Sequence, residues 1–171
     1  MPSLTEGKLR FDFPEGWEVT PYDNWAFYKN QFKDCCGGNK ALDFLAYDPK
    51  QDQLWLIEVK DYRRHPRTKS IHVWDEMAKK ARDTLAGLVA AKANASDPDK
   101  PWATVALKKT KLRFVLHIEQ PTQHSKLFPR ALDPAKLQEK IRQLIKPIDA
   151  HPMVTELNKM AKVQWSAKSF A

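Results

Sequence analysis

Three ionisable residues, Asp43, Glu58 and Lys60, stand in two apolar stretches where charge is unusual. The stretches are residues 41–47 and 54–60, and each has the length and composition of a largely buried β-strand. Side chains alternate between the two faces of a strand, so Glu58 and Lys60 point to the same side. One face at the end of the second strand is therefore predicted to be ionic.

The polar segment between the two stretches has the composition of a turn, which predicts a hairpin. If the loop pairs Tyr47 with Leu54, Asp43 lies opposite Glu58 on one face, with Cβ atoms ~5 Å apart. Two like charges in a half-buried sheet need a cation between them. A divalent ion that prefers oxygen, Mg²⁺ or Mn²⁺, meets this need, with the nearby lysine to hold or polarise a water. A slip of one residue in the pairing would send Asp43 to the opposite face.

Asp43 followed by Glu58, Val59 and Lys60 on a hairpin resembles the catalytic signature of the PD-(D/E)xK nuclease superfamily, which has the restriction-endonuclease-like fold. The resemblance implies that Asp43, Glu58 and the backbone carbonyl of Val59 bind the metal. It implies that Lys60 orients or activates the attacking water. Leu42 stands where the family name has proline.

The resemblance covers residues 8–120 as an order of elements and residues 41–60 as a motif. It implies an Mg²⁺-dependent endonuclease or phosphodiesterase that hydrolyses nucleic acid, and it favours DNA over RNA. One alternative is a non-cleaving nucleic-acid-binding subunit of a recombination, repair or defence assembly that keeps the nuclease fold. Another is a small basic structural protein whose strand end carries a surface Glu-Lys pair. A homodimer, or a protein partner in a larger assembly, remains open.

An acidic residue from an N-terminal helix often joins the metal site in this family. Glu15, Glu18 and Asp23 are the candidates here, and Asp23 is preferred. Residues 15–31 are rich in aromatic side chains and contain Pro21, so their pattern leaves helix and strand open. We expect the rings to pack in the core, with stacking on bases as the alternative.

The chain carries 29 basic and 21 acidic side chains, a net charge of +8, which suits a polyanionic partner. Basic residues are dense directly after the second strand, and four of them are predicted to contact nucleic-acid phosphates. These four are Arg63, Arg64, Arg67 and Lys69. Lys80, on the helix expected next, is a further candidate contact. For a second basic cluster, within residues 108–113, phosphate contact and a solvated surface both remain open.

Composition describes a soluble globular chain with 42% hydrophobic and 29% charged residues. No apolar run approaches the ~20 residues of a membrane span. Residues 1–7 lack the charged leader and apolar core of a secretory signal, so we expect a cytoplasmic protein. The adjacent Cys35 and Cys36 are expected to stay reduced, and the histidine spacing predicts no zinc site.

The elements that must position these residues predict an α/β or α+β domain, with a mixed central β-sheet flanked by helices. We expect one domain over residues 1–171, with a C-terminal helical extension over about 133–171. Asp133 is expected to cap the helix that opens this extension, with Pro134 at its first position. Besides the hairpin, the pattern predicts strands at 8–13, 111–119 and 163–166, helices at 71–93 and 149–160, and a loop at 94–101.

Overall fold

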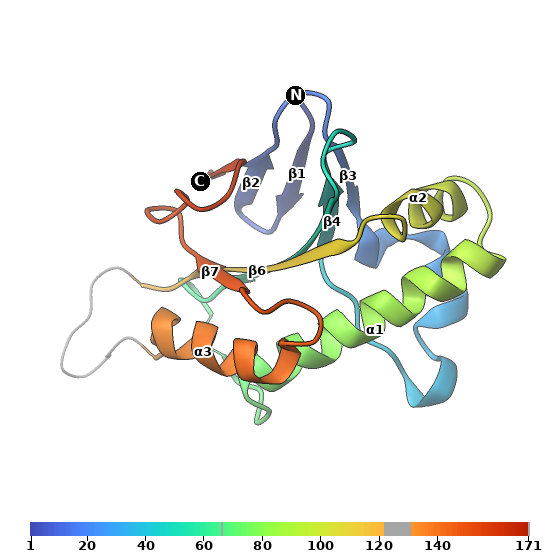
Figure 1. Cartoon of the computed structure of the whole chain (residues 1–171). Helices are drawn as coiled ribbons and strands as arrows, with labels where there is room; N and C mark the ends of the chain where they lie inside the picture. The colour runs from blue at the N-terminus through green and yellow to red at the C-terminus, as the bar shows by residue number, and fades with distance from the viewer. Residues whose placement is uncertain (66, 122–130, 171) are drawn as a thin grey trace.

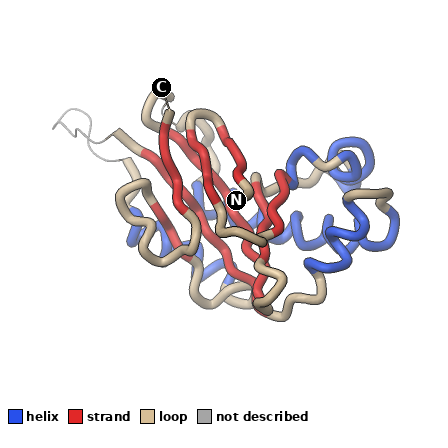
Figure 2. Tube along the Cα trace, turned by 90° about the horizontal axis from the view of Figure 1, so that it is seen from above, coloured by secondary structure: helices blue, strands red, loops and turns tan. Residues whose placement is uncertain are grey.

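The computed structural model describes residues 1–65, 67–121 and 131–170, and its elements form three layers (Figure 1). A five-stranded sheet lies between the helices on one face and a three-stranded sheet on the other (Figures 1 and 2). The strands are β1 (Ser3–Glu6), β2 (Leu9–Asp12), β3 (Glu18–Pro21), β4 (Phe44–Tyr47), β5 (Gln53–Asp61), β6 (Lys111–Glu119), β7 (Met153–Thr155) and β8 (Ser166–Ser169). The main helices are α1 (Val73–Asn94), α2 (Asp99–Ala106) and α3 (Pro134–Ile145).

The central sheet has the strand order β3-β4-β5-β6-β7. Its first three strands are antiparallel, whereas β5, β6 and β7 are parallel. Parallel neighbours need crossover connections, and here α1 and α2 connect β5 to β6 while α3 lies between β6 and β7. The predicted mixed α/β architecture is confirmed at this level.

The predicted pairing of the hairpin is confirmed. Phe44 pairs with Ile57 and Ala46 with Trp55, which is the register in which Tyr47 would face Leu54. Along β5 the side chains alternate between two buried layers, because the strand is covered on both faces.

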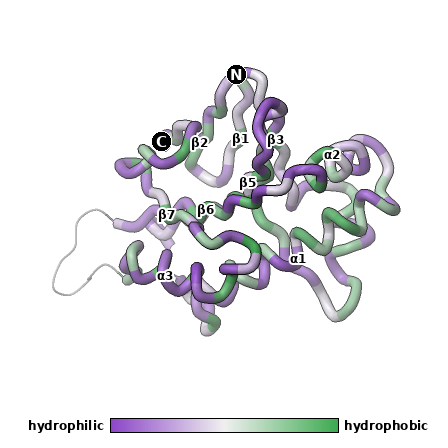
Figure 3. Tube along the Cα trace, viewed as in Figure 1, coloured by the Kyte–Doolittle hydropathy of each residue, from purple (hydrophilic) through white to green (hydrophobic). Residues whose placement is uncertain are grey.

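The two faces of the central sheet bury two separate apolar clusters. Leu54 and Leu56 of β5 pack with Met77 of α1 in the layer beneath the helices. Trp55 and Ile57 pack with residues of β2 on the opposite face, beneath the small sheet of order β1-β2-β8. In Figure 3 hydrophobic and hydrophilic residues alternate along α1, as expected of a helix with one buried face. The helix face of β5 is therefore the face on which Glu58 and Lys60 must lie.

The aromatic N-terminal segment forms the edge strand β3 and then short helical turns. Pro21 ends the strand at this edge, where no further neighbour needs its missing N–H. Tyr22, Trp25 and Tyr28 are buried, and the indole N–H of Trp25 donates to the Thr20 hydroxyl at 2.7 Å. The expected core packing of these rings is confirmed.

The helix at residue 134 begins as predicted. The Asp133 carboxylate accepts a hydrogen bond of 3.0 Å from the Ala135 N–H, and Pro134 takes the first helical position. The two cysteines are free, as expected.

Three predicted elements are wrong in place or kind. Residues 149–160 form no helix, because the Asp149 carboxylate holds a turn by accepting from the N–H groups of Phe114 and His151, each at 2.8 Å, before β7 joins the sheet edge. The last strand is β8, which begins at Ser166 rather than at residue 163. The loop expected at 94–101 ends earlier, because α2 begins at Asp99. The segment expected as a helical extension thus contributes one helix and two strands.

Candidate functional site

Glu58 and Lys60 of β5 face the N-terminal half of α1, where Glu76 and Lys80 lie. Glu58 has no exposed surface, and the side chain of Lys60 is 18% exposed. The Glu58 carboxylate is held from both sides, since Oε1 lies 2.5 Å from Lys60 Nζ and is also contacted by the ammonium of Lys80. Lys80 Nζ lies 3.9 Å from Asp43 Oδ1 as well. The cation that the two carboxylates required is therefore the Lys80 ammonium in this structure.

Asp43 is fixed by the backbone of the facing strand. Its Oδ2 accepts a hydrogen bond of 2.7 Å from the Val59 N–H. Burial, and then the charge of Glu58, raise the pKa of Asp43 to about 7. This carboxyl group therefore exchanges its proton near neutral pH, at the place where the hairpin brings the two acids together.

Lys60 keeps its proton in this setting. Burial alone would favour the neutral amine, but the Glu58 carboxylate outweighs it and raises the pKa of Lys60 above its ordinary value. Lys60 can therefore donate hydrogen bonds to an anion, and it is poorly suited to accept a proton.

Two further carboxylates face this centre from other elements. Burial raises the pKa of Asp23, which also feels the charges of Lys80 and Glu58. Burial, Asp23 and Glu58 together raise the pKa of Glu6, at the end of β1. Asp23, the preferred N-terminal candidate, thus lies within electrostatic reach of the site. Glu6 was missed because nothing in the sequence indicates that the small sheet brings β1 here.

The other two N-terminal candidates lie elsewhere. Glu15 pairs with the amino group of Met1 at 2.6 Å. Glu18 is exposed on β3. Neither makes a contact to Asp43 or Glu58 among the described residues.

Two of the basic residues after β5, Arg67 and Lys69, bind a second buried acid, Glu76 of α1. Its carboxylate accepts from Arg67 at 2.8 Å and from Lys69 at 2.6 Å, and it lies 3.9 Å from Lys60 Nζ. Burial opposes its ionisation, but the hydrogen bonds from Lys69 and Arg67 prevail and lower the pKa of Glu76 to about 2. Sequence reasoning missed Glu76, although it lies four residues before Lys80 and so on the same side of α1.

The residues predicted to contact phosphates differ in whether a carboxylate of the chain already binds them. Arg63 pairs with Asp61 at 2.6 Å, whereas Arg64 is exposed. Lys60, Arg67 and Lys69 line a pocket of about 210 Å³ beside the ionic cluster. In the second basic cluster, Lys109 donates to the Gln51 carbonyl at 2.6 Å and so secures the hairpin loop.

The donor set for a metal consists of two protein carboxylates. No three histidine, cysteine, aspartate or glutamate side chains of the described residues are grouped to hold a metal ion. Glu58 Oε2 is buried and has no hydrogen-bond partner among the described residues. This oxygen is therefore free to bind a metal ion. Mg²⁺ is commonly held by one or two carboxylates together with waters and phosphates, and the pair of Asp43 and Glu58 fits that pattern.

Fold and site together define a basic mixed α/β domain with a buried cluster of acids and lysines. Over 80% of its length the chain is 37% identical to a cysteine--tRNA ligase of Neisseria meningitidis. The chain spans about a quarter, 24%, of the length of that relative. No family model matches the chain, and no solved structure matches it. None of the helices that the described residues form has the length and apolar character to cross a membrane.

This similarity overturns the resemblance to the PD-(D/E)xK nucleases. That resemblance rested on an acid and a Glu-x-Lys motif, whereas the similarity to the ligase extends over most of the chain. The predicted function, a metal-dependent nuclease of the hydrolase class, is therefore wrong. Its alternative, a non-cleaving subunit of a recombination, repair or defence assembly, is not supported either. The restriction-endonuclease-like form of the fold is not confirmed, and the mixed α/β class stands.

Proposed function

We propose that this chain is an RNA-binding domain that serves the charging of tRNA with cysteine. The observation that carries the proposal is the 37% identity, over 80% of the chain, to a protein named cysteine--tRNA ligase. Because the chain spans 24% of that protein, its proposed part is to bind tRNA for the enzyme rather than to perform the whole reaction.

The charge of the chain supports a polyanionic partner. A net charge of +8 attracts RNA by counterion release whatever its sequence. Arg64 and Lys69 are exposed cations of the segment that follows β5, and the Lys69 side chain is 58% exposed. The proposed RNA therefore approaches over the segment that follows β5, where Arg63 and Arg67 are already paired with Asp61 and Glu76.

The preference for DNA is replaced by one for RNA. The DNA preference came only from the nuclease resemblance, and the name of the relative specifies tRNA. A-form RNA is recognised largely through its shape, phosphates and 2′-hydroxyls, so a basic surface suffices for first contact. A protein partner is part of the proposal, since the relative is a much longer chain.

Mg²⁺ or Mn²⁺ is proposed as the ion of the Asp43 and Glu58 pair. Asp43 and Glu58 would hold such an ion through their carboxylate oxygens, and the ion would supply positive charge that favours an RNA phosphate. Lys60 would then donate to the same phosphate, because it keeps its proton. Lys80 would then leave its position between the two acids and contact RNA or solvent. Asp23 would act on the ion only through its charge, because it is not grouped with the two carboxylates as a ligand.

The test is competition between a tRNA transcript and a DNA duplex of equal charge, measured by fluorescence anisotropy. The proposal predicts at least tenfold tighter binding of tRNA, weakened by Arg64→Gln/Lys69→Gln. The matched control, Lys50→Gln/Lys92→Gln, removes the same charge from exposed sites away from the cluster. Equal affinity for both polymers, or equal effects of the two double variants, would reject it.

The ion is tested in the same assay. Mg²⁺ should strengthen tRNA binding by the wild-type chain beyond its effect on Glu58→Gln. If Mg²⁺ strengthens tRNA binding equally in Glu58→Gln and wild type, the ion does not bind at this site. The RNA-binding proposal then depends on the competition assay alone.

A further inference from the structure

A second pocket lies at the opposite end of β5 from the ionic cluster. It has a volume of about 460 Å³, within the range that holds a small ligand. Its walls come from the first residues of β5, from β6, from α3, and from the chain on both sides of β7. We call it the β7 pocket. None of the residues that line it belongs to the site described above.

The lining of the β7 pocket is basic. Arg113 of β6, Arg142 of α3 and Lys162 lie around it, and no carboxylate is among its lining residues. Arg113 is held in place by Asp149, which is buried and lies 3.6 Å from the guanidinium. Arg142 and Lys162 are exposed and make no ion pair among the described residues. Two cations are thus free to meet an anion beside a third that is already oriented.

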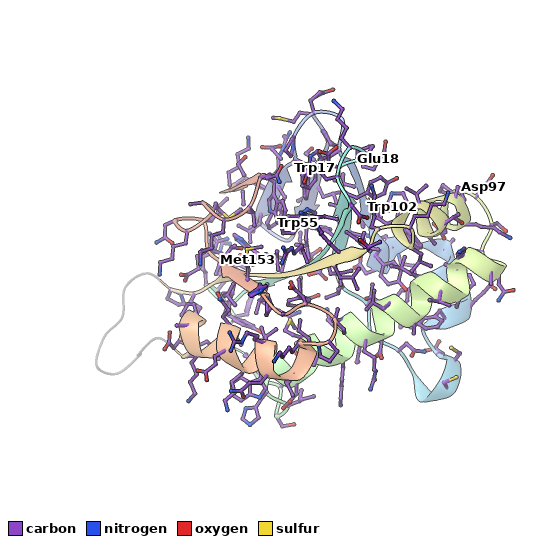
Figure 4. All side chains as sticks on the ribbon, viewed as in Figure 1. Trp17, Glu18, Trp55, Asp97, Trp102 and Met153 are labelled. Atoms are coloured by element: carbon purple, nitrogen blue, oxygen red, sulfur yellow. The ribbon has the colours of Figure 1, made fainter. Side chains whose placement is uncertain are left out.

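The floor of the β7 pocket is aromatic. Trp55 is 5% exposed and packs edge-on against Trp165, with ring centroids 5.0 Å apart. Its indole N–H is buried and has no hydrogen-bond partner in the described part of the chain, which is unusual for a native structure. Figure 4 labels Trp55 and Met153, which both line the pocket. The pocket is therefore lined by one edge of an aromatic ring and by a methionine next to its cations.

We propose that the β7 pocket binds a nucleotide, with the phosphate on Arg113, Arg142 and Lys162. Arginine and lysine bind phosphate by charge-assisted hydrogen bonds, with arginine able to do so in bidentate fashion. The heterocycle lies against Trp55 and Met153, which both line the pocket. Gln138 supplies an amide that can both donate and accept. The nucleotide is either one unit of the proposed RNA or a free mononucleotide, because both present this chemistry.

As a site for an RNA unit, this inference rests on the proposed function, whereas binding of a free mononucleotide does not. A titration of the protein with AMP, with inorganic phosphate and with tRNA separates the cases. The readout is the indole N–H resonance of Trp55 in a ¹⁵N spectrum, assigned by its loss in Trp55→Phe. AMP is expected to shift this resonance saturably, and inorganic phosphate is expected to do so at much higher concentration. The same shift with tRNA identifies an RNA unit, and a shift with AMP alone identifies a free nucleotide.

Charge-matched variants decide whether the cations of the pocket are responsible. Arg142→Gln/Lys162→Gln is expected to weaken AMP binding at least tenfold, whereas Lys108→Gln/Lys146→Gln, with the same loss of charge at exposed positions outside the pocket, is expected to change it less than twofold. Three results would overturn the proposal: no shift with any probe, equal weakening by both double variants, or inorganic phosphate binding as tightly as AMP.

If tRNA binds but leaves the Trp55 resonance unchanged and AMP has no effect, the pocket proposal fails while the proposed function stands. If AMP binds and tRNA does not, the pocket binds a free mononucleotide and the proposed function fails.

Discussion

Lys80 of α1 forms an ion pair with the fully buried Glu58 of β5, and this contact joins the long helix to the central sheet. The same ammonium is the nearest cation to Asp43. Lys60 also pairs with Glu58, but Lys80 is the lysine that lies within 4 Å of both acids among the described residues. Loss of Lys80 is therefore expected to be costly, because it leaves buried negative charge less compensated.

Replacing Lys80 by methionine should lower the free energy of unfolding by about 2–4 kcal/mol at pH 7. Lys79→Met, one residue away and exposed, should change it by less than about 0.5 kcal/mol. Urea unfolding measures both. The double variant Glu58→Gln/Lys80→Met should lose less than the sum of its single changes, since neither partner is then left alone. Additive losses would show that the pair is not coupled.

Asp43→Asn should stabilise the fold at alkaline pH. The folded-state pKa of Asp43 is raised to about 7, so its ionisation on going from acid to alkaline pH favours the unfolded chain. The stability associated with its proton is present below pH ~4 and is lost as the pH rises through 7. The variant should therefore gain roughly 1–3 kcal/mol over wild type at pH 8 and almost nothing at pH 4. A gain that is independent of pH would contradict this assignment.

Glu76→Gln should show the opposite pH dependence. The folded-state pKa of Glu76 is lowered to about 2, so its contribution is present above the ordinary pKa near 4.5 and is lost as the pH falls towards 2. The variant should be less stable than wild type by about 1–2 kcal/mol at pH 7, and the difference should vanish near pH 2. Asp75→Asn, in the same first turn of α1, serves as the control. Equal effects of the two changes would assign the loss to the helix dipole rather than to Arg67 and Lys69.

Gly87→Ala should destabilise the packing of α1 on the N-terminal segment. A Cβ atom at residue 87 would lie 1.9 Å from the hydroxyl oxygen of Tyr22, which is buried. Thermal unfolding should reveal a loss of about 2–3 kcal/mol, although alanine is the better helix former. Tyr22→Phe removes that oxygen, so Gly87→Ala/Tyr22→Phe should recover most of the loss. A double variant as unstable as the single one would place the strain elsewhere.

The hairpin was predictable because the residues that determine it are close together in the sequence. The apolar runs, the polar loop and the strand alternation fix the register, and the acids of β4 and β5 follow from it. The ion pairs of this centre were less predictable. Lys80 was predicted only as a candidate substrate contact, and its ion pair with Glu58 was not foreseen, since the rotation of α1 on the sheet depends on packing across the whole layer. Glu6 reaches the site through the small sheet, whose pairing joins both ends of the chain.

The region after residue 145 shows where local patterns mislead. The apolar residues of 149–160 suit a helix as well as a strand, and only the free edge of β6 decides for β7. The predicted nuclease function was wrong for a related reason. A motif of three charged residues on a hairpin occurs in many proteins that are not related. The similarity over most of the chain to a cysteine--tRNA ligase carries more information than the motif.

The measurement that tests the central claim most directly is the charging of tRNA with cysteine by the related ligase after deletion of its matching segment. Our account predicts that the deletion lowers kcat/KM for tRNA at least tenfold. It predicts that adding this chain restores part of the rate, and that the Arg64→Gln/Lys69→Gln variant restores less. A deletion that leaves kcat/KM for tRNA unchanged would contradict the account.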